Sequence, residues 1–244
     1  MKKMADMADG IVVWGGDEAV TAVRSLAKPG TRLIEWGHKL GFAYVSGYED
    51  KETELQELAE HIMVTKQLLC SSCQVIYVDT DNFDEVKTFA EEFTAYLNNA
   101  VAKYPVDDIG AVAELSIKRR VQLYDDFIGG DYSSKDEVVF YGNNVSVTAV
   151  PDSELELSYM FGNVYVKPLP RSKITEVLRA RKEYLQTAGL ICSPDIREEL
   201  AGKIMRTGVE RITRAGNMSF YFDGEAHDGE FPLLRYTRLI NIEK

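Results

Sequence analysis

The sequence predicts an α/β fold with a mainly parallel sheet and helices on both of its faces. Short, β-prone apolar runs alternate with amphipathic helical stretches along the chain. The first unit is easily recognised, because an apolar run at 11–14, a glycine turn, a helical pattern at 18–26 and a second run at 33–36 follow one another. Two strands joined through a helix are expected to pair in parallel with a right-handed crossover. We expect one sheet to include the strands near Leu33, Val75, Leu190 and Val209.

Composition limits the class of protein. A chain of 244 residues that is 45% hydrophobic is long enough for one large domain or two small ones. The 28 basic and 39 acidic residues give a net charge of −11, which argues against nucleic acid or an anionic membrane as the main partner. No apolar run approaches membrane-spanning length, and residues 1–10 show no signal peptide. Three cysteines, an odd number, suit a reducing compartment, so we expect a cytoplasmic protein.

The remaining elements follow from apolar spacing and from turn residues. Residues 52–69 carry an apolar stripe at helical spacing. A second helix is predicted from the stripe of Val86, Phe89, Ala90, Phe93 and Leu97, and Tyr104 and Pro105 end it. One or two further helices are predicted within 107–127. The last third returns to βα alternation, with Pro194 in the first turn of a helix. The predicted strands are 74–79, 138–141, 145–150, 164–166, 189–192 and 209–212, and the later predicted helices are 173–185 and 194–205.

Two cysteines stand where the helix at 52–69 gives way to the strand at 74–79. Such a cysteine can be a small buried hydrophobe, and the Cys70-x-x-Cys73 spacing also occurs in zinc sites and redox dithiols. Zinc has little support, since Cys192 is the only other cysteine and the three histidines are scattered. A thioredoxin-like pair precedes a helix, whereas this pair follows one. A nucleophilic cysteine on a turn between two rigid elements is the remaining hypothesis, and it needs a partner.

Three other features are candidates of lower specificity. Glu35 ends a strand before a glycine turn, where ligands bind in open α/β sheets, but it can equally be a solvated charge. Gly15 and Gly16 precede a helix and can bring backbone amides close to a phosphate. They lack the full dinucleotide fingerprint, and Asp17 would repel an anion. His227 lies between glycine turns, where a histidine can line a site or merely be exposed.

Several segments carry a resemblance to a known family. Residues 35–39 resemble the Glu-Leu-Gly-Gly-Lys segment of the aldehyde dehydrogenase superfamily, and Cys70 follows Glu35 by 35 residues, close to that family's interval between general base and nucleophile. Tyr236 and Thr237 resemble the family's C-terminal Tyr-Thr strand. The sequence is more similar to the long-chain acyl-CoA reductases of the LuxC family, known from bacterial bioluminescence. The segments that carry this resemblance are 14–20, 67–74, 184–190, 208–214 and 227–234.

The resemblance implies an aldehyde dehydrogenase-like catalytic domain and a specific reaction. Cys70 would attack a fatty acyl thioester to give an acyl-enzyme, which NADPH would reduce to the fatty aldehyde. The backbone N–H of Cys70 would be one oxyanion donor, Glu35 would shuttle a proton, and His227 would orient or protonate. Gly15 and Gly16 would belong to the cofactor side of the site, and no metal is implied. Burial beside an acyl channel would raise the pKa of Glu35 toward neutrality.

The family chain is roughly twice as long, so the resemblance implies the C-terminal catalytic portion of a reductase. We expect residues 1–32 to be the last βα unit of a dinucleotide-binding domain and 33–214 to be the catalytic domain. Residues 215–244 would supply an active-site loop and a terminal strand. The implied partners are fatty acyl-CoA or acyl-protein thioester, an acyl-protein synthetase, an acyltransferase and further copies of the chain. Two alternatives stay open: an aldehyde dehydrogenase that releases acid, and a non-catalytic fragment that serves as a partner-binding surface.

Overall fold

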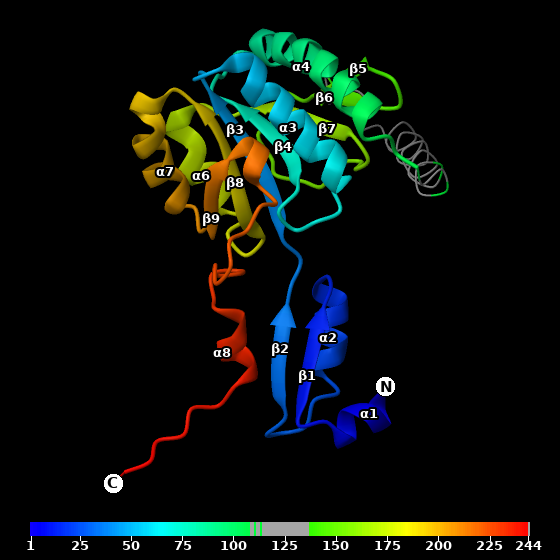
Figure 1. Cartoon of the computed structure of the whole chain (residues 1–244), viewed down its shortest axis with the longest axis vertical. Coiled ribbons are helices and arrows are strands. Elements are labelled where there is room, and N and C mark those ends of the chain that lie inside the picture. The colour runs from blue at the N-terminus through cyan, green and yellow to red at the C-terminus, as the bar shows by residue number, and fades with distance from the viewer. Residues whose placement is uncertain (108–109, 111–112, 114–136, 244) are drawn as a thin grey trace. The chain divides into compact units, whose positions relative to one another are not determined.

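A computed structural model of the chain describes residues 1–107, 110, 113 and 137–243 (Figure 1). The helices predicted within 107–127 lie almost entirely outside the described residues. The chain forms two compact units, a smaller unit of residues 1–39 and 221–244 and a larger unit of residues 40–220. The boundaries therefore fall at 39/40 and 220/221, close to but not at the expected 32/33 and 214/215, and the C-terminal segment belongs with the N-terminal one.

The smaller unit is built on one parallel pair of strands. Its elements are α1 (Lys2–Met7), β1 (Gly10–Trp14), α2 (Asp17–Arg24), β2 (Arg32–Trp36) and α8 (Pro232–Tyr236). Strands β1 and β2 pair in parallel from Gly10 opposite Arg32 to Trp14 opposite Trp36, which confirms the predicted βαβ unit. The expectation that Leu33 shares a sheet with the later strands is wrong, because β1 and β2 form a sheet of their own. The next strand begins at Leu40, and so short a connection cannot make the crossover that parallel neighbours need.

The predicted terminal strand at Tyr236 and Thr237 is also wrong. Helix α8 carries Pro232 in its first turn and ends at Tyr236, and the described residues after it form no strand. The Arg32 guanidinium donates to the Leu234 carbonyl oxygen at 3.0 Å and also to that of Thr237. These backbone acceptors are therefore satisfied by a side chain of β2 rather than by a neighbouring strand.

The larger unit contains a seven-stranded sheet with the order β5-β6-β7-β4-β3-β8-β9. Every neighbouring pair is parallel except β5 with β6, which confirms a mainly parallel sheet. Strand β3 lies between β4 and β8, and all seven of its residues are buried. The strands are β3 (Leu40–Ser46), β4 (Cys73–Val78), β5 (Val138–Tyr141), β6 (Ser146–Ala149), β7 (Asn163–Pro168), β8 (Leu185–Cys192) and β9 (Arg211–Arg214).

Helices cover both faces of this sheet, as predicted (Figure 1). On one face, α3 (Lys51–Thr65) and α4 (Phe83–Lys103) pack through residues such as Leu58 and Phe93 against Ala43 and Ile76. On the other face lie α6 (Ile174–Arg179) and α7 (Arg197–Met205). Short 3₁₀ turns complete the unit: η2 (Arg171–Lys173), η3 (Pro194–Ile196) and η4 (Ala215–Asn217).

Several predicted boundaries shift. Helix α3 ends at Thr65 rather than at residue 69, because Lys66 and Gln67 adopt left-handed backbone conformations with φ of 51° and 59°. Helix α6 ends at Arg179, and residues 180–184 form turns before β8 begins at Leu185. Strand β9 occupies 211–214 instead of 209–212. Within the described ranges, no helix combines the length and the apolar character that crossing a bilayer requires.

A buried histidine in α3 makes the stability of the larger unit sensitive to pH. His61 is 5% exposed, and among the described residues its Nε2 atom has no hydrogen-bond partner. Desolvation lowers the pKa of His61 from 6.5 to about 4. The folded protein therefore holds His61 neutral, while the unfolded chain takes up a proton below about pH 6.5. This contribution to stability is complete above pH 6.5 and is lost as the pH falls toward 4.

We predict that His61→Leu flattens the pH dependence of unfolding. Between pH 7.5 and 4.5 the free energy of unfolding, measured in urea, should fall by about 2 to 3 kcal/mol less in the variant than in the wild type. His38→Leu is the matched control, because His38 is only partly buried. Parallel pH curves for wild type and His61→Leu would contradict the assignment.

Candidate active site

Cys70 lies on a turn that joins the end of α3 to the start of β4. The turn is closed by its own backbone and side chains, since the Ser72 N–H donates to the Leu69 carbonyl oxygen at 2.9 Å and the Leu69 N–H donates to Ser72 Oγ at 3.0 Å. Ser71 Oγ lies 3.1 Å from Ser219 Oγ, which ties the turn to the segment after η4. The turn is therefore fixed on both sides of Cys70, at the edge of the sheet where β4 begins.

A glycine of the central strand lets this turn approach closely. A Cβ atom at Gly41 would lie 2.7 Å from the Ser72 carbonyl oxygen and 2.9 Å from that of Ser71. Gly41 stands at the start of β3 and pairs with Cys73 of β4. Only glycine leaves room for these carbonyl groups, so the backbone next to Cys70 rests directly on the central strand.

The structure describes all three cysteines of the sequence, and Cys70 alone among them is not buried. Burial raises the pKa of the Cys73 thiol to about 12, and its Sγ donates to the Val75 carbonyl oxygen at 3.4 Å. Burial also raises the pKa of the Cys192 thiol. A thiol that stays protonated is a poor nucleophile, so burial and a raised pKa both argue against Cys73, whereas Cys70 is accessible. Among the described residues, no three or more His, Cys, Asp or Glu side chains are grouped to hold a metal ion.

Glu35 belongs to the smaller unit, where it lies on β2 beneath the last turn of α2. The Arg24 guanidinium donates to both of its carboxylate oxygens at 2.7 Å, a bidentate ion pair. The hydrogen bond from Arg24 lowers the pKa of the Glu35 carboxyl below its ordinary value, against a smaller opposing effect of burial. The expectation of a raised pKa is therefore wrong for this structure, because Glu35 faces a cation rather than an apolar channel.

Trp36, the next residue of β2, is 3% exposed and is in contact with several polar and aromatic side chains. Its ring stacks on Trp14 with centroids 6.0 Å apart, and the His227 ring meets it edge-on at 5.3 Å. The Arg235 guanidinium lies 4.4 Å from the Trp36 ring, and Trp36 Nε1 donates to the Tyr236 hydroxyl at 3.2 Å. These contacts fix His227 beside the carboxyl end of β2.

His227 itself sits on a tight turn. Its backbone exchanges hydrogen bonds with Glu230 in both directions, at 2.8 and 3.1 Å. Asp228 and Gly229 between them have φ of 49° and 73°. His227 Nε2 lies 3.8 Å from an Asp228 carboxylate oxygen, an ion pair only when the imidazole is protonated. These contacts fix the position of the His227 ring and place the Asp228 carboxylate near it.

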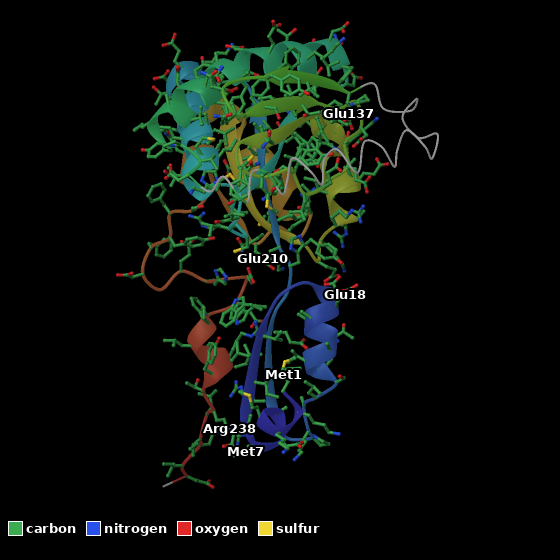
Figure 2. All side chains as sticks on the ribbon, turned by 90° about the vertical axis from the view of Figure 1, so that its right-hand side faces the viewer. Met1, Met7, Glu18, Glu137, Glu210 and Arg238 are labelled. Carbon is green, nitrogen blue, oxygen red and sulfur yellow. The ribbon has the colours of Figure 1, made fainter. Side chains whose placement is uncertain are left out.

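Gly15 and Gly16 form the turn between β1 and α2. The Gly15 N–H donates to the Trp36 carbonyl oxygen at 3.2 Å, and a Cβ at Gly16 would meet nothing within 4 Å. The turn therefore leaves open space at the amino end of α2. Asp17 and Glu18 occupy the first turn of this helix, where Glu18 is labelled in Figure 2. Their carboxylates oppose a phosphate, and a dinucleotide fold uses more strands than this one pair, so the smaller unit does not by itself form a complete dinucleotide site.

In the smaller unit His227 and Gly15 contact Trp36, and Glu35 precedes Trp36 on β2 with its side chain bound to Arg24. Cys70 belongs to the larger unit. Sequence reasoning missed Arg24 and the role of Trp36. The βαβ crossover, which returns the last turn of α2 over β2, was the available signal for Arg24. The sequence pattern also gave no indication of the buried glutamines on either side of Cys70, because apolar spacing does not predict buried polar side chains.

Solved structures with similar folds define the class. Δ-pyrroline-5-carboxylate dehydrogenase from Mycobacterium tuberculosis matches with a TM-score of 0.62 at 12% identity, covering 95% of this chain and 48% of that one. Betaine aldehyde dehydrogenase from Staphylococcus aureus matches with a TM-score of 0.61 at 11% identity, covering 93% and 49%. The chain therefore has an aldehyde dehydrogenase-like α/β fold, as the resemblance implied.

The family follows from the sequence comparison. The profile described as acyl-CoA reductase (LuxC) matches residues 1–239, so the chain belongs to the LuxC family. Long-chain acyl-protein thioester reductase from Aliivibrio fischeri is 24% identical over 249 residues, covering 100% of this chain and 48% of the relative. Long-chain acyl-protein thioester reductase 2 from Photobacterium leiognathi is 27% identical over 258 residues, with the same coverage. The chain spans about half the length of these relatives.

We predict that Arg24→Gln raises the pKa of Glu35 toward the ordinary value of a glutamate. The substitution removes the two hydrogen bonds that stabilise the ionised carboxylate. A pH titration of ¹³C-labelled glutamate side chains, with the Glu35 signal assigned by Glu35→Gln, measures the change. Lys28→Gln is the control, because it removes a nearby cation whose partner is Asp6. A Glu35 pKa that moves equally in both variants would contradict a specific effect of Arg24.

Proposed function

We propose that the chain is the catalytic portion of an oxidoreductase that converts a long-chain fatty acyl thioester, acyl-CoA or acyl-protein, to the fatty aldehyde. Membership of the LuxC family supports the substrate class, and the similarity to long-chain acyl-protein thioester reductases supports reduction of an acyl-protein thioester. The observation that carries the proposal is the state of Cys70. It is the one cysteine that is not buried, and it sits on a fixed turn in an aldehyde dehydrogenase-like fold.

Cys70 supplies the nucleophile in this proposal. Its thiolate attacks the thioester carbonyl carbon, the bond from that carbon to the donor sulfur breaks, and the donor leaves as a thiol after taking a proton. One thioester replaces another, so the acyl group stays activated for reduction. The backbone N–H of Cys70 is the proposed oxyanion donor within this chain. Leu68 and Leu69 are 56% and 50% exposed, and they offer apolar contacts for a fatty chain beside the nucleophile.

The groups around Trp36 are proposed to handle protons. The ion pair with Arg24 lowers the pKa of Glu35 and favours its ionised form, so its proposed role is that of a proton acceptor rather than a donor. His227, fixed against Trp36 beside Asp228, is proposed to orient or protonate the developing alcohol. The open turn at Gly15 and Gly16 is the part of the chain proposed to approach a cofactor. We propose that NADPH supplies the hydride in the complete enzyme, and the described residues of the smaller unit contribute one βα turn to such a site.

Labelling with an acyl thioester tests the nucleophile. We predict that the chain, incubated with radiolabelled long-chain acyl-CoA, forms a thioester on Cys70 that persists. Cys70→Ala should abolish the label, and Cys73→Ala should keep most of it, because Cys73 is buried and its thiol stays protonated. Peptide mass spectrometry and lability to hydroxylamine identify the bond and the residue.

The other outcomes separate the alternatives. Rapid release of the label as free acid would favour an aldehyde-oxidising enzyme over a reductase. Absence of label on the wild-type chain would favour a non-catalytic, partner-binding segment. If Cys73→Ala loses the label and Cys70→Ala keeps it, the nucleophile is Cys73 rather than Cys70.

We predict that Glu35→Gln separates acylation from reduction. In a preparation that reduces acyl thioesters, the variant should still form the acyl-Cys70 thioester but should lose at least about tenfold in aldehyde formation, because proton transfer slows. Acyl-enzyme yield and aldehyde release are measured side by side from pH 6 to 8. Glu35→Asp is the companion variant, since it keeps a carboxylate. If Glu35→Gln forms aldehyde at the wild-type rate across this pH range, Glu35 has no role in proton transfer and is only a charge at the end of a strand.

A further inference from the structure

The turn that carries Cys70 is bracketed by two buried glutamines. Gln67 is 1% exposed and Gln74 is 3% exposed, and each reaches across the turn to the other end. Gln67 Nε2 donates to the Cys73 carbonyl oxygen at 3.0 Å, and Gln74 Nε2 donates to the Gln67 carbonyl oxygen at 2.8 Å. The two ends of the segment 67–74 are therefore bonded to each other by side chains.

The same glutamines bind a second turn, at 158–162. Ser158 Oγ donates to Gln74 Oε1 at 2.7 Å and accepts from Gln67 Nε2 at 2.9 Å. The Gly162 N–H donates to Gln67 Oε1 at 3.0 Å. Ser158 is thus the point at which both glutamines meet, and together the three side chains form what we call the glutamine clamp (Gln67, Gln74 and Ser158).

The backbone of both turns is strained where the glutamine clamp holds it. Lys66 and Gln67 have φ of 51° and 59°, and Met160 and Phe161 have φ of 59° and 49°. Residues other than glycine adopt this region at a cost, and they keep it only when surrounding contacts impose it. The Phe161 N–H donates to the Lys66 carbonyl oxygen at 3.1 Å, so the two strained segments also bond directly.

We propose that the glutamine clamp positions Cys70 for acyl transfer. This inference rests on the proposed function. None of the three side chains touches Cys70 through a described hydrogen bond, so they act through the backbone that carries it. The clamp fixes the direction of the Cys70 N–H and of its Sγ relative to the sheet. Attack on a thioester needs both, the thiol as nucleophile and the N–H as oxyanion donor, whereas attack on a small alkyl halide needs only the thiol.

Ser158→Ala is the variant of choice. It removes the hydroxyl at which both glutamines meet, yet Gln67 keeps its bond to Cys73, and the Ser158 N–H, which donates to Gln74 Oε1 at 3.3 Å, remains at this position. Ser146→Ala is the matched control, because Ser146 is also a buried serine and its hydroxyl donates to Asn163 at 2.7 Å rather than to a residue of the glutamine clamp. Both variants lose a buried hydroxyl, so a general effect of destabilisation appears in both.

Three measurements are made on wild type, Ser158→Ala and Ser146→Ala: the rate of Cys70 acylation at saturating palmitoyl-CoA, the rate of Cys70 alkylation by iodoacetamide, and amide hydrogen exchange of peptides that cover 66–74. We expect Ser158→Ala to acylate at least about tenfold more slowly, to alkylate within about threefold of wild type, and to exchange faster in 66–74. Ser146→Ala should match the wild type in all three.

The outcomes that overturn the proposal are distinct from failure of the proposed function. Equal acylation by wild type and Ser158→Ala, or unchanged exchange in 66–74, overturns the positioning role. A parallel fall in acylation and alkylation also overturns it, because the thiol rather than its orientation would then have changed. Absence of acylation in the wild-type chain overturns the proposed function itself.

Discussion

The complete burial of strand β3 is the constraint on which the larger unit depends. A strand paired on both edges and covered on both faces can satisfy its backbone only through its neighbours, so β4 and β8 must lie in register beside it. The same close packing extends to the turn that carries Cys70. The Ser71 and Ser72 carbonyl groups approach Gly41, at the start of β3, more closely than a side chain at this position would permit. The Cys70 turn is thus built against the fully buried central strand, which is where a group that must be held within a fraction of an ångström is best supported.

The chain divides its chemical groups between two units with different environments. Cys70, the proposed nucleophile, lies on a turn closed by buried neutral amides and hydroxyls, which impose geometry without adding charge. The groups proposed to handle protons lie in the smaller unit among ions and aromatic rings, where the hydrogen bond from Arg24 lowers the pKa of Glu35. The orientation of Cys70 and the pKa of Glu35 are therefore set by separate parts of the sequence. Substitutions around one residue are expected to leave the other residue's property unchanged.

Periodicity and turn residues predicted the type of most elements correctly, because long apolar stripes such as that of α4 leave little choice. They failed where a side chain overrode local propensity. Helix α3 stops at Thr65, where Lys66 and Gln67 adopt left-handed backbone conformations and the buried Gln67 side chain bonds Ser158, and no hydrophobic pattern encodes that. Leu33 was assigned to the wrong sheet because alternation predicts parallel strands without saying which strands are neighbours.

The sequence also predicted part of the candidate site. The position of Cys70 between a helix and a strand is visible in the sequence, and so is the resemblance of residues 35–39 to a known motif. The charge state of Glu35 is not, because it depends on Arg24, which is distant along the chain and comes close only through the βαβ crossover. The inequality of Cys70 and Cys73 is likewise a matter of burial, which their spacing does not reveal.

The stacked pair of tryptophans has a spectroscopic consequence. The sequence contains two tryptophans, and both Trp14 and Trp36 belong to the smaller unit. Emission excited at the red edge of protein absorption therefore originates in that unit alone, while the seven-stranded sheet is silent except through tyrosine. Far-ultraviolet circular dichroism, in contrast, is dominated by the helices and strands of the larger unit. The two signals act as separate reporters, so superposition or separation of their denaturation curves reveals whether the two units unfold as one cooperative body.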